Sequence, residues 1–140
     1  MSLIPERDVS NESISAYLKS QGVSNRVEGD GDVYVEDRNL GFPFWISIDR
    51  PFKMLMLHTF ICFGSTEYAE QALERAHRFA DGLITPHFFL EDNDLHARFV
   101  MTFREGVLGA HVFDVACRFS DCFMRAKNSP GIGPCPRLLH

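Results

Sequence analysis

The sequence predicts an α+β protein, in which an antiparallel sheet of about five strands carries three helices in the order α-β(3-4)-α-β-β-α. Two observations support this class. Segments with the apolar–polar alternation of strands follow one another with short turns between them, and only three segments have helical spacing of apolar residues. No strand–helix alternation runs through the chain, which argues against a parallel sheet built from βαβ units.

The first helix is expected over residues 10–21, where apolar residues recur at helical spacing. Ser10 can cap its N-terminus, and Gly22 suits the position after its C-terminus. Three to four strands then follow, over residues 23–28, 33–35, 43–49 and 52–63.

The strand over residues 52–63 is apolar on both faces, with Met54, Met56 and Phe60 on one of them. Such a strand is expected to be covered on both faces. Trp45, the single tryptophan, points away from the apolar face of the preceding strand. It is either buried under a helix on the second face or an anchor in a partner-binding surface, where Trp and Met are enriched.

A second helix with an alanine stripe is expected from Ser65 or Thr66 to about Ala80. A hairpin follows, with strands over residues 83–90 and 95–104, and Pro86 favours an edge position or a bulge for the first of them.

The last helix, over residues 108–126, has a main apolar stripe and a second one formed by Phe113, Cys117 and Met124. A helix with two apolar faces usually covers a core and also contacts something else.

The length of 140 residues suits a single domain, expected over residues 10–127, with a lead over 1–9 and a flexible tail over 128–140. The net charge of −5, from 14 Lys+Arg and 19 Asp+Glu, argues against a nucleic-acid partner. No signal peptide and no apolar run of about 20 residues is present, so no membrane association is expected. The four cysteines lack metal or disulfide spacing and favour a reducing, cytoplasmic location.

No motif for catalysis, a cofactor or a metal is found. Glu28, Asp30 and Asp32 alternate with glycines, but the calcium-binding Glu that should follow is absent, so a solvated hairpin turn is the better interpretation. The six histidines lack metal-ligand spacing, although His87 and His96 lie on the two arms of one hairpin. We therefore expect no catalytic residue, no cofactor and no metal.

Three runs resemble the YbjN family of bacterial sensory transduction regulators: ISAYLKSQG at residues 14–22, GFPFWISI at 41–48 and REGV at 104–107. The similarity spans about residues 10–126. One departure is AHRF at residues 76–79, where many members have Trp-Asn or Asn. The resemblance implies a fold similar to type III secretion chaperones, a homodimer and no catalytic centre.

The sequence and the resemblance together predict a non-enzymatic protein-interaction module, a chaperone-like or regulatory adaptor that forms a homodimer and binds a further protein. The dimer is expected through the last helix or a sheet edge. The candidate partner or dimer interface consists of Trp45, Met54, Met56, Phe60, Phe113, Cys117 and Met124. The alternative is a small-molecule-binding or cryptic enzymatic domain with an apolar pocket around Trp45, lined by histidines such as His58, His87 or His96.

Overall fold

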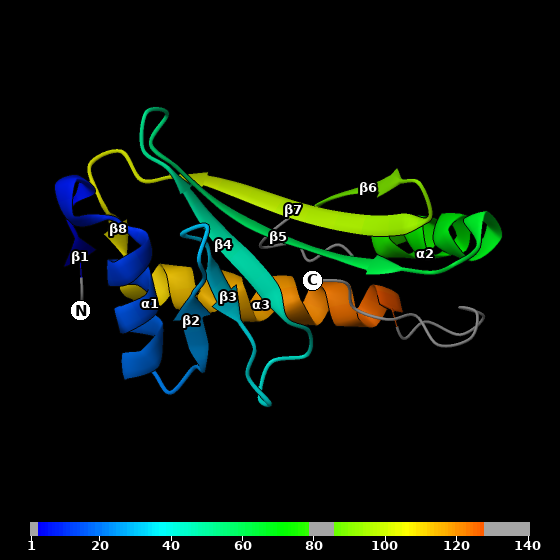
Figure 1. The fold of residues 1–140 in the computed structure, drawn as a ribbon, viewed down its shortest axis with the longest axis horizontal. Helices are drawn as coiled ribbons and strands as arrows, with labels where there is room; N and C mark the ends of the chain where they lie inside the picture. Colours follow the sequence, from blue (N-terminus) through cyan, green and yellow to red (C-terminus); the bar gives the residue numbers. More distant parts are fainter. Residues whose placement is uncertain (1–2, 79–85, 128–140) are drawn as a thin grey trace.

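The computed structural model describes residues 3–78 and 86–127 and contains a six-stranded and a two-stranded antiparallel sheet with three α-helices (Figure 1). The elements are β1 (Leu3–Ile4), a single 3-10 turn (Glu6–Asp8), α1 (Asn11–Ser20), β2 (Asn25–Val27), β3 (Val33–Val35), β4 (Phe44–Asp49), β5 (Met54–Cys62), α2 (Thr66–Arg78), β6 (His87–Glu91), β7 (Asp94–Thr102), β8 (Val107–Leu108) and α3 (Gly109–Lys127). The α+β class is confirmed, and the strands outnumber the expected five.

The larger sheet has the strand order β2-β3-β4-β5-β7-β6. Its two longest strands, β5 and β7, pair over their full length in the middle of the sheet. β6 is an edge strand, as Pro86 predicted, because proline before it cannot donate a ladder hydrogen bond. Three expected segments lie outside the described residues. They are the part of the expected strand over 83–85, the end of the expected second helix over 79–80, and the expected tail over 128–140.

The start of α1 follows the predicted capping pattern. The Ser10 side chain accepts a hydrogen bond from the Ser13 backbone N–H at 3.0 Å, and the Ser13 hydroxyl accepts one from the Ser10 N–H at 2.9 Å. This reciprocal pair satisfies two N–H groups near the helix start. Gly22, with φ of 81°, takes the left-handed conformation that ends the helix.

The two-stranded sheet was not expected, because its strands are only two residues long. Leu3 pairs with Leu108 and Ile4 pairs with Val107, so the expected lead is joined to the residues just before α3. Gly106 makes this approach possible. Its φ is 102°, and a β-carbon there would lie 2.7 Å from the Ile4 carbonyl oxygen.

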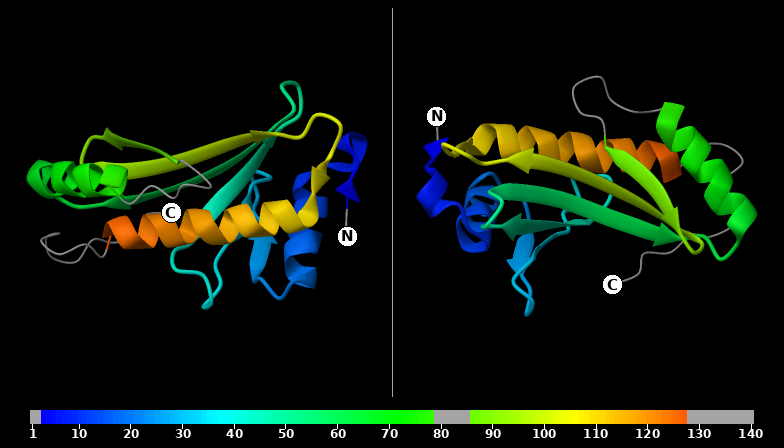
Figure 2. Two further views of the ribbon diagram at one scale, coloured as in Figure 1. Left: turned by 180° about the vertical axis from the view of Figure 1, so that it is seen from behind. Right: turned by 90° about the horizontal axis from the view of Figure 1, so that it is seen from above.

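One face of the six-stranded sheet packs on the helices and forms the core (Figures 1 and 2). Phe44 of β4 meets Phe119 of α3 at a ring-centroid distance of 5.6 Å, and Phe42 meets Phe123 at 4.6 Å. The alanine stripe of α2 is fully buried, which brings this helix close to β6 and β7. The core therefore lies between the sheet and α3, and the opposite face of the sheet is directed away from α3.

Within the described residues, none of the helices is both long enough and apolar enough to cross a membrane.

Candidate functional site

The face of the six-stranded sheet opposite to α3 is the candidate site, and we call it the open face. It consists of the residues of β2 to β7 whose side chains alternate with those of the core. The expectation that β5 would be covered on both faces is wrong for the described residues, because α1, α2 and α3 all pack on the core side (Figure 2). The apolar side chains of the open face are instead partly covered by one another.

An aromatic ladder crosses the open face. Directly and diagonally paired positions of an antiparallel sheet lie on the same face, and here they carry rings on five neighbouring strands, with Trp45 and Phe60 as the diagonal pair. The ladder runs from Tyr34 to Trp45, Phe60, His96 and Phe89, with successive ring-centroid distances of 5.1, 5.8, 5.2 and 5.0 Å. These separations are those of favourable aromatic pairs. The rings therefore stabilise one another, and no helix of residues 3–78 and 86–127 covers them.

Two histidines meet beside the ladder. His58 Nε2 lies 3.0 Å from His96 Nδ1, so one imidazole donates a hydrogen bond to the other. Burial, with smaller contributions from the charges of His96 and Arg98, lowers the pKa of His58 to about 4. Burial also lowers the pKa of His96. Both imidazoles are therefore neutral at pH 7, and the middle of the open face carries no histidine charge.

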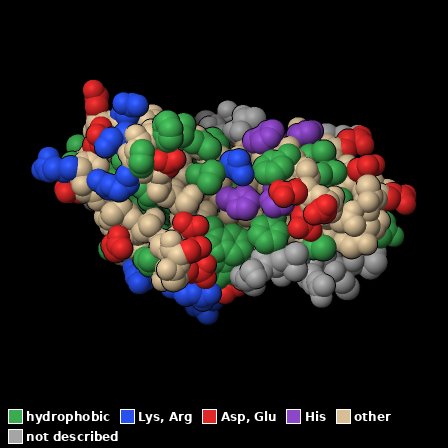
Figure 3. Space-filling model, turned by 45° about the horizontal axis from the view of Figure 1, so that its top comes forward, with side chains coloured by type: hydrophobic (Ala, Val, Ile, Leu, Met, Phe, Trp, Pro, Cys, Tyr) green, Lys and Arg blue, Asp and Glu red, His purple; other side chains and the backbone are tan. Residues whose placement is uncertain are grey.

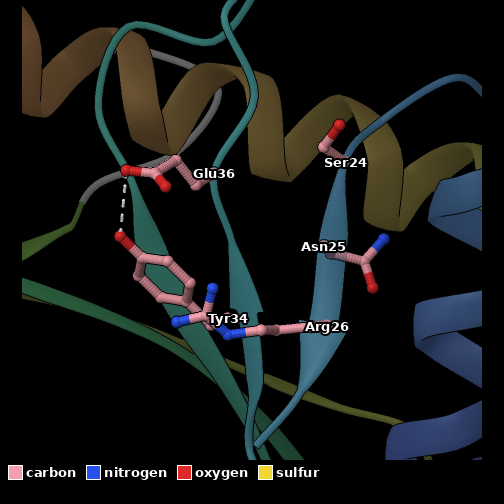
Figure 4. A pocket seen from close by; sticks show the side chains of 5 residues that line it. All are labelled: Ser24, Asn25, Arg26, Tyr34 and Glu36. Atoms are coloured by element: carbon pink, nitrogen blue, oxygen red, sulfur yellow. Dashed lines mark hydrogen bonds between the residues drawn. The ribbon is translucent and has the colours of Figure 1, made fainter.

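At one end, the aromatic ladder stops at Tyr34 on β3, where the side chain of Arg26 from the edge strand β2 lies over the ring (Figure 4). The Arg26 guanidinium carbon from β2 lies 4.8 Å from the centroid of the Tyr34 ring, and the Tyr34 hydroxyl donates to Glu36 at 3.2 Å. Burial, and then the Glu36 carboxylate, raise the pKa of Tyr34 to about 12. Beside these residues, Ser24 and Asn25 complete a hollow of about 160 Å³. This end of the ladder is thus already occupied by a cation from the chain itself.

A larger hollow of about 400 Å³ lies in the middle of the open face. Strands β4 and β5 form its floor, and the turn between β2 and β3 forms its acidic wall. The lining residues are Glu28, Asp30, Asp32, Trp45, Ser47, Met56, His58 and Phe60.

The acidic turn holds Trp45 in place. The Trp45 indole N–H donates to Glu28 Oε1 at 2.9 Å, while the other Glu28 oxygen lies 3.2 Å from Arg26. Burial, followed by the charges of Asp30 and Glu28, raises the pKa of Asp32. The pocket expected around Trp45 therefore exists, but its wall is acidic rather than apolar, and nothing in the sequence pattern placed this turn against the tryptophan.

A family model described as "Putative bacterial sensory transduction regulator" matches residues 10–120 of the chain. The chain belongs to the YbjN family. The fold is also similar to a solved structure of YbjN from E. coli, whose description reads "a putative transcription regulator", with a TM-score of 0.56 at 12% identity over 83% of this chain and 90% of that chain. At this identity, the likeness to YbjN shows a shared fold. No curated protein matches the chain.

The structure divides the predicted interface residues between two surfaces. Trp45, Met54, Met56 and Phe60 all lie on the open face. The α3 residues are elsewhere, on the core side of the sheet. Phe113 and Met124 are half-buried and pack against the core. Cys117 is also half-buried, and burial raises the pKa of its thiol.

Sequence reasoning missed Tyr34 and Phe89 and did not anticipate the His58–His96 contact. His87 stacks on Phe89 at 5.3 Å and is paired with Arg98, so the hairpin does not bring His87 and His96 together. The period-two alternation of each strand could have placed these side chains on one face, but not next to one another. Cys62, Cys117 and Cys122 are free thiols, and the described residues contain no group of three or more potential ligands that could hold a metal ion.

Proposed function

We propose that this YbjN-family protein is a non-enzymatic regulatory adaptor, and that its open face binds a polypeptide partner. The family description supports the regulatory role. The observation that carries the binding role is the aromatic ladder, which extends over five strands and is not covered by any described helix.

The open face has the composition of a contact surface. Beyond the ladder it presents Met54 and Val100, whose side chains are 42% and 41% exposed, with half-buried Met56 between them. Aromatic residues and Met are enriched in interfaces, and burial of apolar area contributes about 25 cal/mol per Å². Because these side chains stand on paired strands, little ordering is required when a partner binds.

Photo-crosslinking in native cells tests this proposal. A photoreactive phenylalanine derivative at Val100, on the open face, is expected to capture a discrete polypeptide. The control places the same group at His111, which is exposed on α3 and on the other side of the sheet. No adduct at position 100, or the same adducts at both positions, would overturn the proposed binding role.

We also propose that the chain is a homodimer through the region where β8 leads into α3. Leu3 and Leu108, paired across β1 and β8, are 58% and 39% exposed and form an apolar patch apart from the open face. A two-fold axis through this patch would bury both copies of each leucine.

Light scattering tests the dimer. The expected mass at low micromolar concentration is twice the chain mass of 15.9 kDa, and Leu108→Asp is expected to halve it without loss of the circular-dichroism signal. Leu108 is a better probe than Phe113, because Phe113 packs against the core and its substitution would also destabilise the fold. A wild-type mass of one chain would refute the dimer and leave the open-face proposal untouched.

A further inference from the structure

We propose that the segment bound on the open face is basic, and that one of its Lys or Arg side chains enters the hollow beside Trp45. This inference rests on the proposed function, since it specifies the chemistry of the partner that the adaptor binds.

The charges around the aromatic ladder are mainly negative. Glu28, Asp30 and Asp32 lie along one side of it, and Glu91 and Asp94 lie at the β6–β7 hairpin on the other side. Figure 3 shows histidines in the middle of this surface, hydrophobic side chains around them, and acidic side chains to both sides. A surface of this kind attracts a basic segment and repels an acidic one.

The arginines on the same face neutralise the hollow only in part: Arg26 is ion-paired with Glu28, whereas no ion pair among the described residues joins Asp30 or Asp32. Arg26 lies over the Tyr34 ring and contacts the Glu28 oxygen that does not bind Trp45. Arg98 is paired with His58 in the register of β5 and β7, and its guanidinium carbon lies 5.3 Å from the centroid of the Phe89 ring. The two arginines also show that cations already rest on rings at both ends of this ladder.

The hollow itself combines the two features that bind an organic cation. Its floor contains the Trp45 and Phe60 rings, which are nearly parallel at 13° and 5.8 Å apart, and ring faces attract ammonium and guanidinium groups. Its wall holds three carboxylates, and their mutual repulsion contributes to the raised pKa of Asp32. A bound cation would relieve that repulsion, while the Trp45–Glu28 hydrogen bond keeps the indole in place.

A polypeptide fits this surface better than a free small cation does. From the hollow, the ladder continues over Phe60 to His96 and Phe89, and Met56 borders it toward Val100. A small cation would use only the hollow, whereas an extended segment would place a basic side chain in it and apolar neighbours on the rings. A second copy of the chain would bring an equally acidic face against this one, which like-charge repulsion disfavours.

Trp45 is the only tryptophan, so its fluorescence reports directly on the hollow. The probes are two tryptophan-free peptides, one of alternating Arg and Leu and one with Glu in place of Arg. The Arg peptide is expected to cause a saturable change that weakens at high salt, and the Glu peptide is expected to cause none. Equal responses to both peptides, or an equally strong response to free arginine amide, would overturn the inference.

A matched pair of variants locates the charge effect. Glu28→Gln with Asp32→Asn is expected to weaken binding of the Arg peptide about fivefold, because each of these half-buried but solvent-accessible carboxylates contributes under about 1 kcal/mol. The glutamine can still accept the Trp45 hydrogen bond. The control, Glu12→Gln with Glu70→Gln, removes the same charge from exposed positions on α1 and α2 and should leave the affinity unchanged.

Equal weakening of peptide binding in both variants would refute a specific site in the hollow. If the first variant does not fold, the wild-type titrations with the Arg and Glu peptides decide the question.

The crosslinked partner separates this inference from the proposed adaptor role. An adduct at position 100 with a segment that lacks basic residues would refute this inference and leave the adaptor role standing, whereas no adduct would refute the adaptor role.

Discussion

The burial of His58, with the smaller effect of its neighbour His96, predicts that the stability of the fold decreases as the pH falls from about 6.5 to about 4. The folded protein holds the pKa of His58 at about 4, compared with 6.5 ordinarily, so over this range the unfolded chain binds a proton that the folded chain does not. The contribution of His58 to the free energy of unfolding is therefore fully present above pH 6.5 and is lost as the pH falls from 6.5 to about 4. His96, whose pKa is also lowered, acts in the same direction.

The magnitude follows from the same two values. A difference between 6.5 and about 4 corresponds to an upper limit of about 3 kcal/mol for His58, at about 1.4 kcal/mol per pH unit. Because the imidazole is only half-buried on the open face, solvent screening reduces the expected contribution to about 1 kcal/mol.

Urea denaturation at a series of pH values, followed by far-ultraviolet circular dichroism, measures this contribution. The carboxylates of the chain also titrate in this range, so the comparison is between wild type and His58→Gln. The wild type should lose about 1 kcal/mol more than the variant between pH 7 and 4. His111→Gln, at an exposed position of α3, is the control and should behave as wild type. Identical pH profiles for wild type and His58→Gln would refute the reasoning.

Three further substitutions test the packing. Phe119→Ala should lower the free energy of unfolding by about 3–5 kcal/mol in urea denaturation, because the ring is fully buried against Phe44; a loss below about 1 kcal/mol would contradict this packing. Ser120→Ala should cost about 1–3 kcal/mol by the same measurement, because the buried hydroxyl accepts from the Phe42 N–H at 2.6 Å and donates to the Phe42 carbonyl at 2.7 Å. Gly106→Ala should speed hydrogen exchange at the β8 amides and leave β5 unchanged, because the new methyl group meets the Ile4 carbonyl oxygen; unchanged protection of β8 would contradict the β1–β8 pairing.

Local signals predicted most of the secondary structure. The Ser10 cap and Gly22 bound α1 correctly, and the strand expected over residues 95–104 is β7. These features depend on neighbouring residues, which the sequence shows directly. The β1–β8 pair was missed because two-residue strands have no periodicity, and their pairing joins positions more than a hundred residues apart.

The candidate site was predictable only in part. Alternation places Met56 and Phe60 on one face of their strand and Trp45 opposite to the apolar face of the preceding strand, and the register of β4 with β5 brings all three onto the same face of the sheet. The ladder also requires the register between non-consecutive strands, such as β5 with β7, and this register is set by packing over the whole core. The same holds for the turn of Glu28 to Asp32, which is correct as a turn but is brought against Trp45 only by the pairing of β2, β3 and β4.

The position of α3 after every described strand in the sequence bears on how a nascent polypeptide folds. Phe119 and Phe123 of this helix fill the core beneath Phe44 and Phe42, which are made some seventy-five to eighty residues earlier. Until α3 leaves the ribosome, the apolar core side of β4 and β5 lacks the helix that covers it. Such a chain is expected to complete its core only after α3 has been synthesised, and its uncovered apolar surface is prone to aggregation until then.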